Sequence, residues 1–263
     1  MQADFPTPET SIPIEQHTHS ERSPDHRQGV ADNRPRRIHR RGILGAGVLA
    51  AGGGFFAGNG VCAENSLSSD ASPAEVLEYL YAGNERFANA QPLAKDRSIQ
   101  RVREVANEQK PFAAFLGCAD SRVPIEIVFD QGFGDLFVTR IAGNIASSEN
   151  IGSLEFGTLI LGAKVLFVLG HSNCGAVAAT IKADEVPGQI SGLFQHIRPA
   201  AKESRGMLDK AVALNVRNQA ITLAESSPVI AKLVRDKKLV IAGGVYDLST
   251  GKVARVEIPT IES

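Results

Sequence analysis

The sequence predicts an α/β fold with a mostly parallel central β-sheet, flanked by helices and closed by an antiparallel C-terminal edge strand. Three apolar runs without alternation, at residues 112–117, 165–170 and 239–245, are typical of strands buried on both faces. Residues 252–258 instead alternate between apolar and polar, as a strand at a sheet edge does. Helical patterns separate the runs, and strands that alternate with helices favour a parallel sheet covered on both faces.

The domain is expected to begin with two helices. Ser72 and Glu75 fit a capping box with proline at the first helical position, and helical spacing then continues toward Phe87. A second helical pattern covers residues 97–109, and Pro111 is expected to end it.

The remaining elements follow in order after the first buried run. Residues 135–140 predict another strand and residues 151–161 an apolar helix. Residues 192–205 and 210–224 predict two further helices, and a turn at residues 248–251 leads into the edge strand.

Two clusters that contain cysteine follow the first two buried runs directly. Cys118, Asp120 and Arg122 lie in one cluster, and His171 and Cys174 lie in the other. Because ligands in such sheets sit beyond the carboxyl ends of the strands, we expect both clusters at one sheet edge. Two thiolates and an imidazole are a donor set that prefers zinc to magnesium or calcium.

Two simpler interpretations stay open from the residues alone. Cys118 and Cys174 could form a disulfide, which is common in exported proteins. His171, three residues before Cys174 in a glycine-flanked turn, favours a metal instead. Asp120 and Arg122 could be a surface salt bridge of little energetic value, although their position beside a ligand favours a role in chemistry.

Composition excludes several classes of function. The formal net charge is -1, tryptophan is absent and aromatic residues make up 6% of the chain. These values predict no nucleic-acid partner, since the chain has neither the excess of positive charge that binds phosphates nor the aromatic side chains on which bases stack.

The N-terminal part differs from the rest of the chain. Residues 1–33 are polar and are expected to be disordered. Residues 34–63 combine an arginine cluster with an uncharged, glycine-rich apolar stretch, the pattern of an export signal. The pair Arg40-Arg41 resembles a twin-arginine signal, with an approximate cleavage site before Glu64.

Alternatives to a cleaved signal are an uncleaved membrane anchor and a basic cytoplasmic tail. The 22 residues from Gly42 to Ala63 are long enough to cross a bilayer, but eight of them are glycine. A lipoprotein at Cys62 is less favoured, because the preceding residues match a lipobox poorly. We expect residues 64–263 outside the cytoplasm, in the periplasm or its equivalent, with membrane contact only through an uncleaved leader.

At the two clusters the chain resembles a known family. Residues 118–123 (CADSRV) and 170–176 (GHSNCGA) are similar to the two signatures of the β-class carbonic anhydrases. Residues 83–87, 134–144 and 244–247 resemble other segments of that family. The resemblance covers about residues 73–258.

The resemblance implies reversible hydration of carbon dioxide to bicarbonate and a proton, through zinc-bound hydroxide. It implies one Zn²⁺ per chain, held by Cys118, His171 and Cys174. Asp120 would pair with Arg122 and orient the hydroxide. Without that pairing Asp120 could become a fourth metal ligand in a closed state, and the sequence allows both states.

The resemblance also implies substrate-binding residues and an assembly. Gln109 and Phe137 fall where one branch of the family has a substrate-contacting glutamine and a pocket phenylalanine, although Gln109 could simply cap a helix. Phe156 falls where many plant members have tyrosine, and Ile141 would complete an apolar wall. A homodimer or higher homo-oligomer is expected.

Two other functions stay open. The same zinc fold could act on carbon disulfide or carbonyl sulfide, since the active-site residues would barely differ. A zinc-stabilised, bicarbonate-binding scaffold without turnover is the third possibility.

Overall fold

The computed structural model describes residues 67–93, 95–183 and 185–259. The expected polar segment 1–33 and the leader at 34–63, with Cys62, lie outside the described residues.

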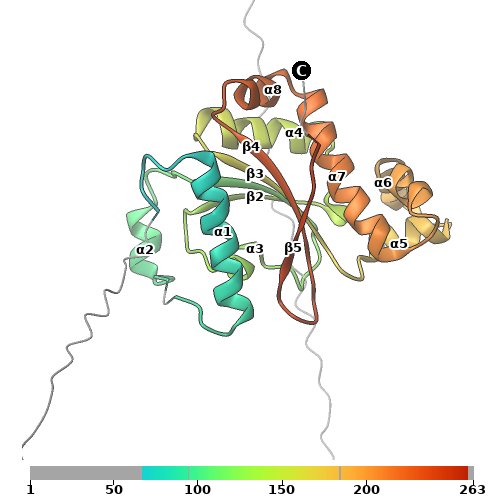
Figure 1. Cartoon of the computed structure of the whole chain (residues 1–263), viewed down its shortest axis with the longest axis horizontal. Coiled ribbons are helices and arrows are strands. Elements are labelled where there is room, and N and C mark those ends of the chain that lie inside the picture. Colours follow the sequence, from blue (N-terminus) through green and yellow to red (C-terminus); the bar gives the residue numbers. More distant parts are fainter. Residues whose placement is uncertain (1–66, 94, 184, 260–263) are drawn as a thin grey trace, which may run out of the picture. The chain divides into compact units, whose positions relative to one another are not determined.

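A five-stranded sheet in the order β2-β1-β3-β4-β5 forms the centre of the fold (Figure 1). The first four strands are parallel, and β5 pairs antiparallel with β4. The predicted fold class is therefore confirmed. The strands are β1 Ala113–Gly117, β2 Leu136–Arg140, β3 Val165–His171, β4 Val240–Tyr246 and β5 Val253–Val256.

Helices cover both faces of this sheet, which explains why every residue of β1 and β3 is buried. The α-helices are α1 Pro73–Ala88, α2 Ile99–Glu104, α3 Ile125–Val128, α4 Ser148–Glu155, α5 Gly175–Lys182, α6 Ser191–Glu203, α7 Leu208–Ser226 and α8 Pro228–Arg235. The π-helical segment η2 (Phe156–Ile160) continues α4, and single 3₁₀ turns occupy η1 (Ala142–Asn144) and η3 (Gly188–Ile190).

One hydrophobic core lies on each face of the sheet, and alternate residues of the same strands contribute to the two cores. Phe115 of β1 and Phe167 of β3 belong to the core under α1, and their rings stack with centroids 5.2 Å apart. Leu116 and Val168, their neighbours in sequence, belong to the core under α7 instead. This alternation follows from the two-residue period of a strand.

Helix α1 begins with the predicted capping box. The Ser72 hydroxyl accepts a hydrogen bond from the backbone N–H of Glu75, and the Glu75 carboxylate accepts one from the backbone N–H of Ser72.

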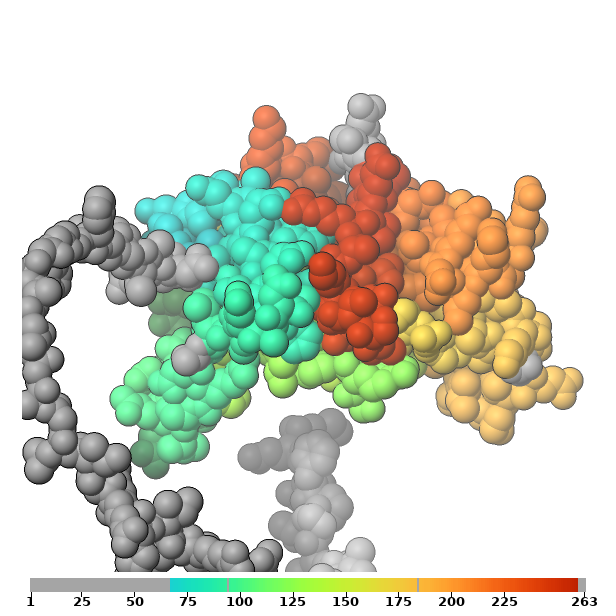
Figure 2. Space-filling model, turned by 60° about the horizontal axis from the view of Figure 1, so that its bottom comes forward, coloured from blue at the N-terminus to red at the C-terminus, as the bar shows by residue number. Residues whose placement is uncertain are grey.

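An ion pair links α1 to the edge strand β5. The side chain of Glu78 on α1 lies 2.7 Å from that of Arg255 on β5. Figure 2 shows α1 and this C-terminal strand side by side on the surface.

The prediction for the second helix is wrong at its end. Helix α2 stops at Glu104 rather than at Pro111, and residues 106–110 are exposed without helical structure. No residue of α2 is buried, so no packing supports an extension of the helix. Among the described residues, no helix is both long and apolar enough to cross a membrane.

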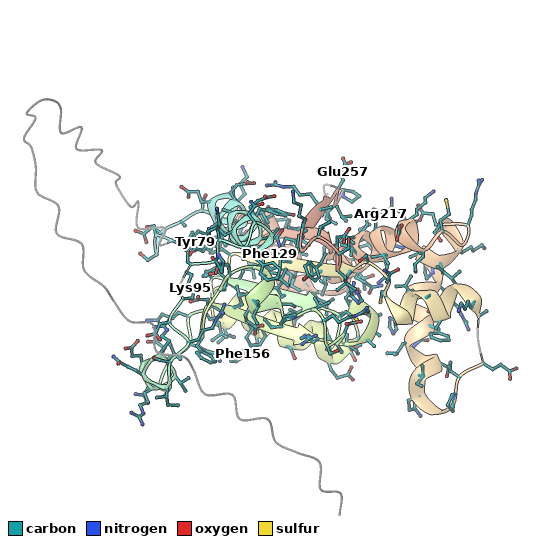
Figure 3. All side chains as sticks on the ribbon, turned by 90° about the horizontal axis from the view of Figure 1, so that it is seen from below. Tyr79, Lys95, Phe129, Phe156, Arg217 and Glu257 are labelled. Atoms are coloured by element: carbon teal, nitrogen blue, oxygen red, sulfur yellow. The ribbon has the colours of Figure 1, made fainter. Side chains whose placement is uncertain are left out.

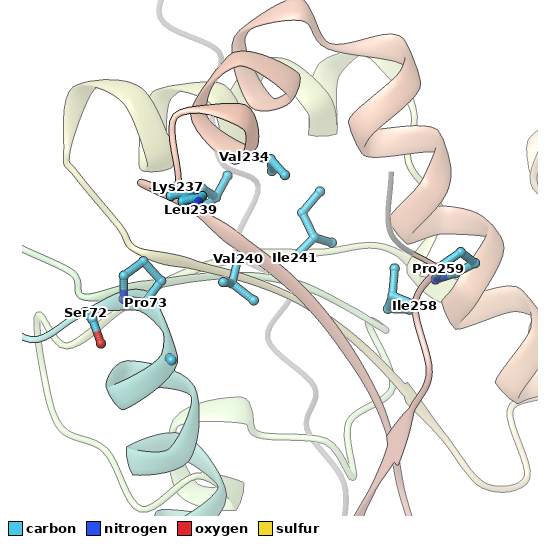
Figure 4. A pocket seen from close by; sticks show the side chains of 10 residues that line it. Ser72, Pro73, Val234, Lys237, Leu239, Val240, Ile241, Ile258 and Pro259 are labelled. Carbon is cyan, nitrogen blue, oxygen red and sulfur yellow. The ribbon is translucent and has the colours of Figure 1, made fainter. Parts of the chain in front are cut away.

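An apolar groove of about 520 Å³ lies at the amino end of β4 (Figure 4). Val240 and Ile241, the first residues of β4, line it together with Leu239 and Ile258. His171 pairs with Tyr246 at the opposite end of the same strand, so this groove is remote from the cysteine clusters.

Candidate metal centre

Two neighbouring parallel strands bring the cysteine clusters together. Cys118 comes directly after β1, His171 is the last residue of β3, and Cys174 lies at the start of α5. Strands β1 and β3 pair in parallel, with Gly117 opposite Leu169. The two sulfurs and one ring nitrogen of His171 consequently lie within 4.8 Å of one another.

The donor atoms of this group fit a soft metal ion such as zinc. Cys118, His171 and Cys174 are all buried, and both cysteines are free thiols. The Nδ1 atom of His171 lies 2.9 Å from the carbonyl oxygen of Ser172, and donation there leaves the lone pair on Nε2. That Nε2 atom is buried and has no hydrogen-bond partner in the described part of the chain, as expected of a metal ligand.

The two thiols of the group titrate very differently. Hydrogen bonding from the Cys174 thiol, opposed by burial, lowers the pKa of Cys118 to about 4. The same hydrogen bond, together with burial, raises the pKa of Cys174. Burial alone would lower the pKa of His171, but the neighbouring Cys118 thiolate raises it by more. The lowered pKa favours the thiolate form of Cys118, the form in which cysteine binds metals.

Asp120 lies beside the metal group and is held by Arg122. The guanidinium donates from Nε to Oδ1 at 2.9 Å and from Nη2 to Oδ2 at 2.8 Å, a bidentate pair. These bonds, with the backbone N–H of Arg122, hold the pKa of Asp120 well below its usual range. Asp120 Oδ2 is 3.7 Å from His171 Nε2. The structure thus has the paired arrangement, with an ionised carboxylate next to the metal group.

Arg140, at the end of β2, was not identified from the sequence. Its Nε donates to the carbonyl oxygen of Cys118 at 2.9 Å, and its Nη2 donates to the carbonyl oxygen of Asp120. Because Arg140 pairs with Gly117 across the sheet, it lies level with the first cluster. A basic residue at the end of the predicted strand 135–140 was the available signal.

The predicted substrate-binding residues are not all near this group. Ile141 packs against the cluster that contains Cys118 and Cys174. Phe137 pairs with Ala114, four residues before Cys118, which places it about 13 Å away along the strand at the usual rise.

Gln109 and Phe156 are both exposed. Gln109 lies in the segment that leads into the amino end of β1, not at the end where Cys118 follows. The Phe156 ring lies 6.3 Å from that of Phe137, on the other side of the sheet from the buried Phe129 (Figure 3). Within one chain, the structure does not bring Gln109, Phe137 or Phe156 to the metal group.

Comparisons with known proteins point to one family. The family model described as carbonic anhydrase matches residues 113–253, which include both cysteine clusters. A carbonic anhydrase of Mycolicibacterium smegmatis is 35% identical over 192 residues, covering 70% of this chain and 93% of that protein. Carbonic anhydrase 2 of Mycobacterium tuberculosis is 33% identical, covering 69% of this chain and 91% of that protein.

Solved structures agree in fold. The Coccomyxa β-carbonic anhydrase in complex with acetazolamide has a TM-score of 0.54 and 27% identity, covering 72% of this chain and 87% of that one. A tetrameric β-carbonic anhydrase from Sordaria macrospora has a TM-score of 0.57, covering 71% of this chain and 99% of that one, although only 22% of the residues are identical. With its Cys-His-Cys group at the carboxyl edge of the sheet, the chain belongs to the carbonic anhydrase family, in its β class.

Proposed function

We propose that this enzyme binds one Zn²⁺ through Cys118, His171 and Cys174 and catalyses the reversible hydration of carbon dioxide to bicarbonate. One observation carries the proposal. A buried Cys-His-Cys group lies next to an aspartate that Arg122 keeps ionised. A purely structural zinc site would normally have four protein ligands and would not need that pair.

The residues around the metal have distinct roles. Bound zinc supplies a Lewis acid that lowers the pKa of a water molecule and so provides a nucleophile near neutral pH. Asp120, 3.7 Å from His171 Nε2, is placed to accept a hydrogen bond from that nucleophile and to orient it toward carbon dioxide. Arg122 holds the carboxylate in this orientation, and Ile141 supplies apolar surface beside the ligands.

Stopped-flow hydration of carbon dioxide by the zinc-loaded protein tests this function directly. Rapid, zinc-dependent proton release supports the proposal. Zinc-dependent turnover of carbonyl sulfide or carbon disulfide without hydration of carbon dioxide would replace it with the second function. A zinc-loaded protein that is inactive on all three would point to the scaffold.

We also propose that the chain works as a homodimer or higher homo-oligomer. Exposed apolar side chains lie beside edge strand β2 and on the segment η2, and we call them the apolar surface around β2. Ile127 and Phe133 line a hollow with Leu136 of β2. Phe156 packs against Phe137 of β2, and Leu159 and Ile160 are exposed on the same segment η2. Apolar patches of this kind are typical of protein interfaces. The Sordaria relatives are described as tetrameric. A substrate role for Gln109, Phe137 or Phe156 requires that they reach a metal group from a second copy.

We further propose that the leader exports the domain from the cytoplasm. Support comes from the sequence alone, where Arg40-Arg41 precedes an uncharged apolar stretch. An uncleaved leader would anchor the domain to the membrane instead.

A further inference from the structure

Two buried amides on α7 lie behind the metal group. Asn215 and Gln219 are four residues apart, so they share one face of the helix, and they are only 1% and 2% exposed. Their neighbours Val216, Ala220 and Leu223 are apolar core residues. A buried amide destabilises a fold unless hydrogen bonds satisfy it, so the bonds that these two make are informative.

Both amides bind the backbone of the segment that carries η1. Asn215 Nδ2 donates to the carbonyl oxygen of Gly143 at 2.9 Å. Gln219 Oε1 accepts from the backbone N–H of Ala146 at 2.9 Å. Gln219 Nε2 also donates to Asn215 Oδ1 at 3.1 Å, which links the two amides.

This pattern permits only one orientation of each amide group. The oxygen of Gln219 must face the Ala146 N–H, so its nitrogen faces Asn215 Oδ1 and the carbonyl oxygen of His196, 3.1 Å away. Asn215 must then present its nitrogen to Gly143. The hydrogen bonds therefore run in one direction, from the Ala146 N–H through Gln219 and Asn215 to the carbonyl oxygen of Gly143.

The segment held by this network touches a metal ligand. The backbone N–H of Gly143 donates to the sulfur of Cys118 at 3.3 Å, in a buried position. Gly143 has φ +75°, and a Cβ there would lie 2.7 Å from Cδ1 of Ile197, so the turn fits tightly at this point.

Helix α7 is itself seated closely on the sheet. A Cβ on Gly170 of β3 would lie 2.6 Å from Cγ2 of Val216, and one on Gly243 of β4 would lie 2.7 Å from its Cγ1. Val216, the neighbour of Asn215 in the sequence, therefore packs directly against glycines of two adjacent strands. This close packing fixes the distance between the amide of Asn215 and the turn it holds.

We propose that Asn215 and Gln219 are positioning residues for the metal centre, which hold η1 so that the Gly143 N–H donates to the Cys118 sulfur. This inference rests on the proposed metal site and deepens it. An N–H donor at a ligating sulfur draws negative charge away from it, and groups that hydrogen-bond to ligands tune both the metal and its affinity.

Substitution of the asparagine tests the proposal through a spectroscopic signal. Asn215→Leu keeps the approximate size but removes the donor to Gly143, and Asn215→Asp keeps only an acceptor. In the cobalt-substituted protein we expect the thiolate-to-cobalt charge-transfer band to move to longer wavelength, because the sulfur becomes more electron-rich. We also expect the zinc dissociation constant, from chelator competition, to rise roughly tenfold.

Asn84 provides the matched control. It is a 2% exposed amide of α1 that donates to the carbonyl oxygens of Val128 and Gly251 and accepts from the N–H of Val253. Asn84→Asp should lower stability but leave the cobalt band and the zinc dissociation constant unchanged. Equal bands in Asn215→Asp and the wild type would overturn the proposal, as would an equal shift in Asn84→Asp.

A measurement on the wild-type protein does not depend on how the variants fold. With the NMR-active isotope of cadmium in the site, a hydrogen bond to the ligating sulfur gives a scalar coupling between cadmium and the Gly143 amide proton. We expect this coupling, and its absence in a cadmium-loaded protein would overturn the proposal. Failure of the wild type to bind any metal would instead contradict the proposed function itself.

Discussion

At the scale of single residues, the Cys-His-Cys group lies beside Asp120, whose carboxylate is held in its ionised form. Arg122 makes two side-chain hydrogen bonds and one backbone hydrogen bond to Asp120. A carboxylate fixed in this way is oriented before substrate arrives, and such preorganisation is a main source of catalytic rate. Asp120 and its orientation should therefore affect turnover more than metal binding.

Asp120→Ala is the variant that separates these two effects. We expect turnover to fall about 100-fold or more, because the nucleophile loses its orienting acceptor. Zinc content, measured by metal analysis, should stay near one ion per chain, since the three ligands remain. Asp236→Ala is the control, because Asp236 pairs with Lys232 at the exposed C-terminal end of α8. A near-normal rate in Asp120→Ala would remove the role assigned to this residue.

That Cys118, His171, Cys174 and Asp120 come together was predictable from the sequence, because two short clusters each follow a buried apolar run. Arg140 and the Asn215–Gln219 pair were not. Arg140 acts through backbone carbonyls of residues about 20 positions away. Asn215 and Gln219 lie within an ordinary helical pattern, in which a buried amide and an exposed one look alike. Only the packing of α7 on the sheet distinguishes them.

At the scale of elements, α1 depends on a capping box that the sequence predicts directly. Ser72→Ala should lower the free energy of unfolding by about 1 kcal/mol, since the first turn loses a side-chain acceptor. Thermal unfolding followed by circular dichroism should show a fall in Tm of roughly 2–4 °C. The exposed Ser69 is a control, and Ser69→Ala should leave Tm unchanged. No difference between the two variants would mean that the box does not stabilise α1.

The capping box also predicts a dependence on pH. Hydrogen bonds from the backbone N–H and then the hydroxyl of Ser72 lower the pKa of Glu75 from 4.5. A depressed folded-state pKa stabilises the fold above that ordinary value, and the contribution disappears as pH falls through the folded pKa. The difference in Tm between wild type and Glu75→Gln should therefore be constant at neutral pH and shrink below pH 4.5. A difference that grows in acid would contradict this assignment.

Among the elements, the strands were predicted best and the short helices worst. Apolar runs predicted β1, β3 and β4 within about one residue, because β1 and β3 are buried on both faces and no residue of β4 is exposed. The end of α2 was wrong, since α2 contacts too little of the core for its sequence pattern to fix its length. Helices α5 and α8 were not predicted, because each is only eight residues long and so carries little periodic signal.

At the scale of the whole molecule, the exposed apolar surface around β2 predicts that the chain assembles with further copies of itself. We expect light scattering of the purified domain to give the mass of a dimer or a larger multiple. Leu159→Glu should shift the mass toward the monomer, because Leu159 is 52% exposed on η2 within that surface. Met207→Glu, at an equally exposed apolar position between α6 and α7, should not. A monomeric wild type would contradict the proposed assembly.

The leader makes a prediction about the mature chain. If residues 34–63 are a cleaved twin-arginine signal, the N-terminal sequence of the exported protein should begin at Glu64. Its intact mass should equal that of residues 64–263. Replacing Arg40 and Arg41 by lysine should retain the uncleaved protein in the cytoplasm. A mature protein that still carries residues 34–63 would favour the membrane anchor, and normal export of the lysine variant would rule out the twin-arginine route.

The most direct test of the account compares hydration of carbon dioxide by wild type and Cys174→Ala, before and after metal removal and zinc addition. The account predicts that chelation abolishes hydration in the wild type, that zinc restores it, and that Cys174→Ala neither retains zinc nor recovers activity. A wild-type protein that stays fully active after its metal has been removed would contradict the account.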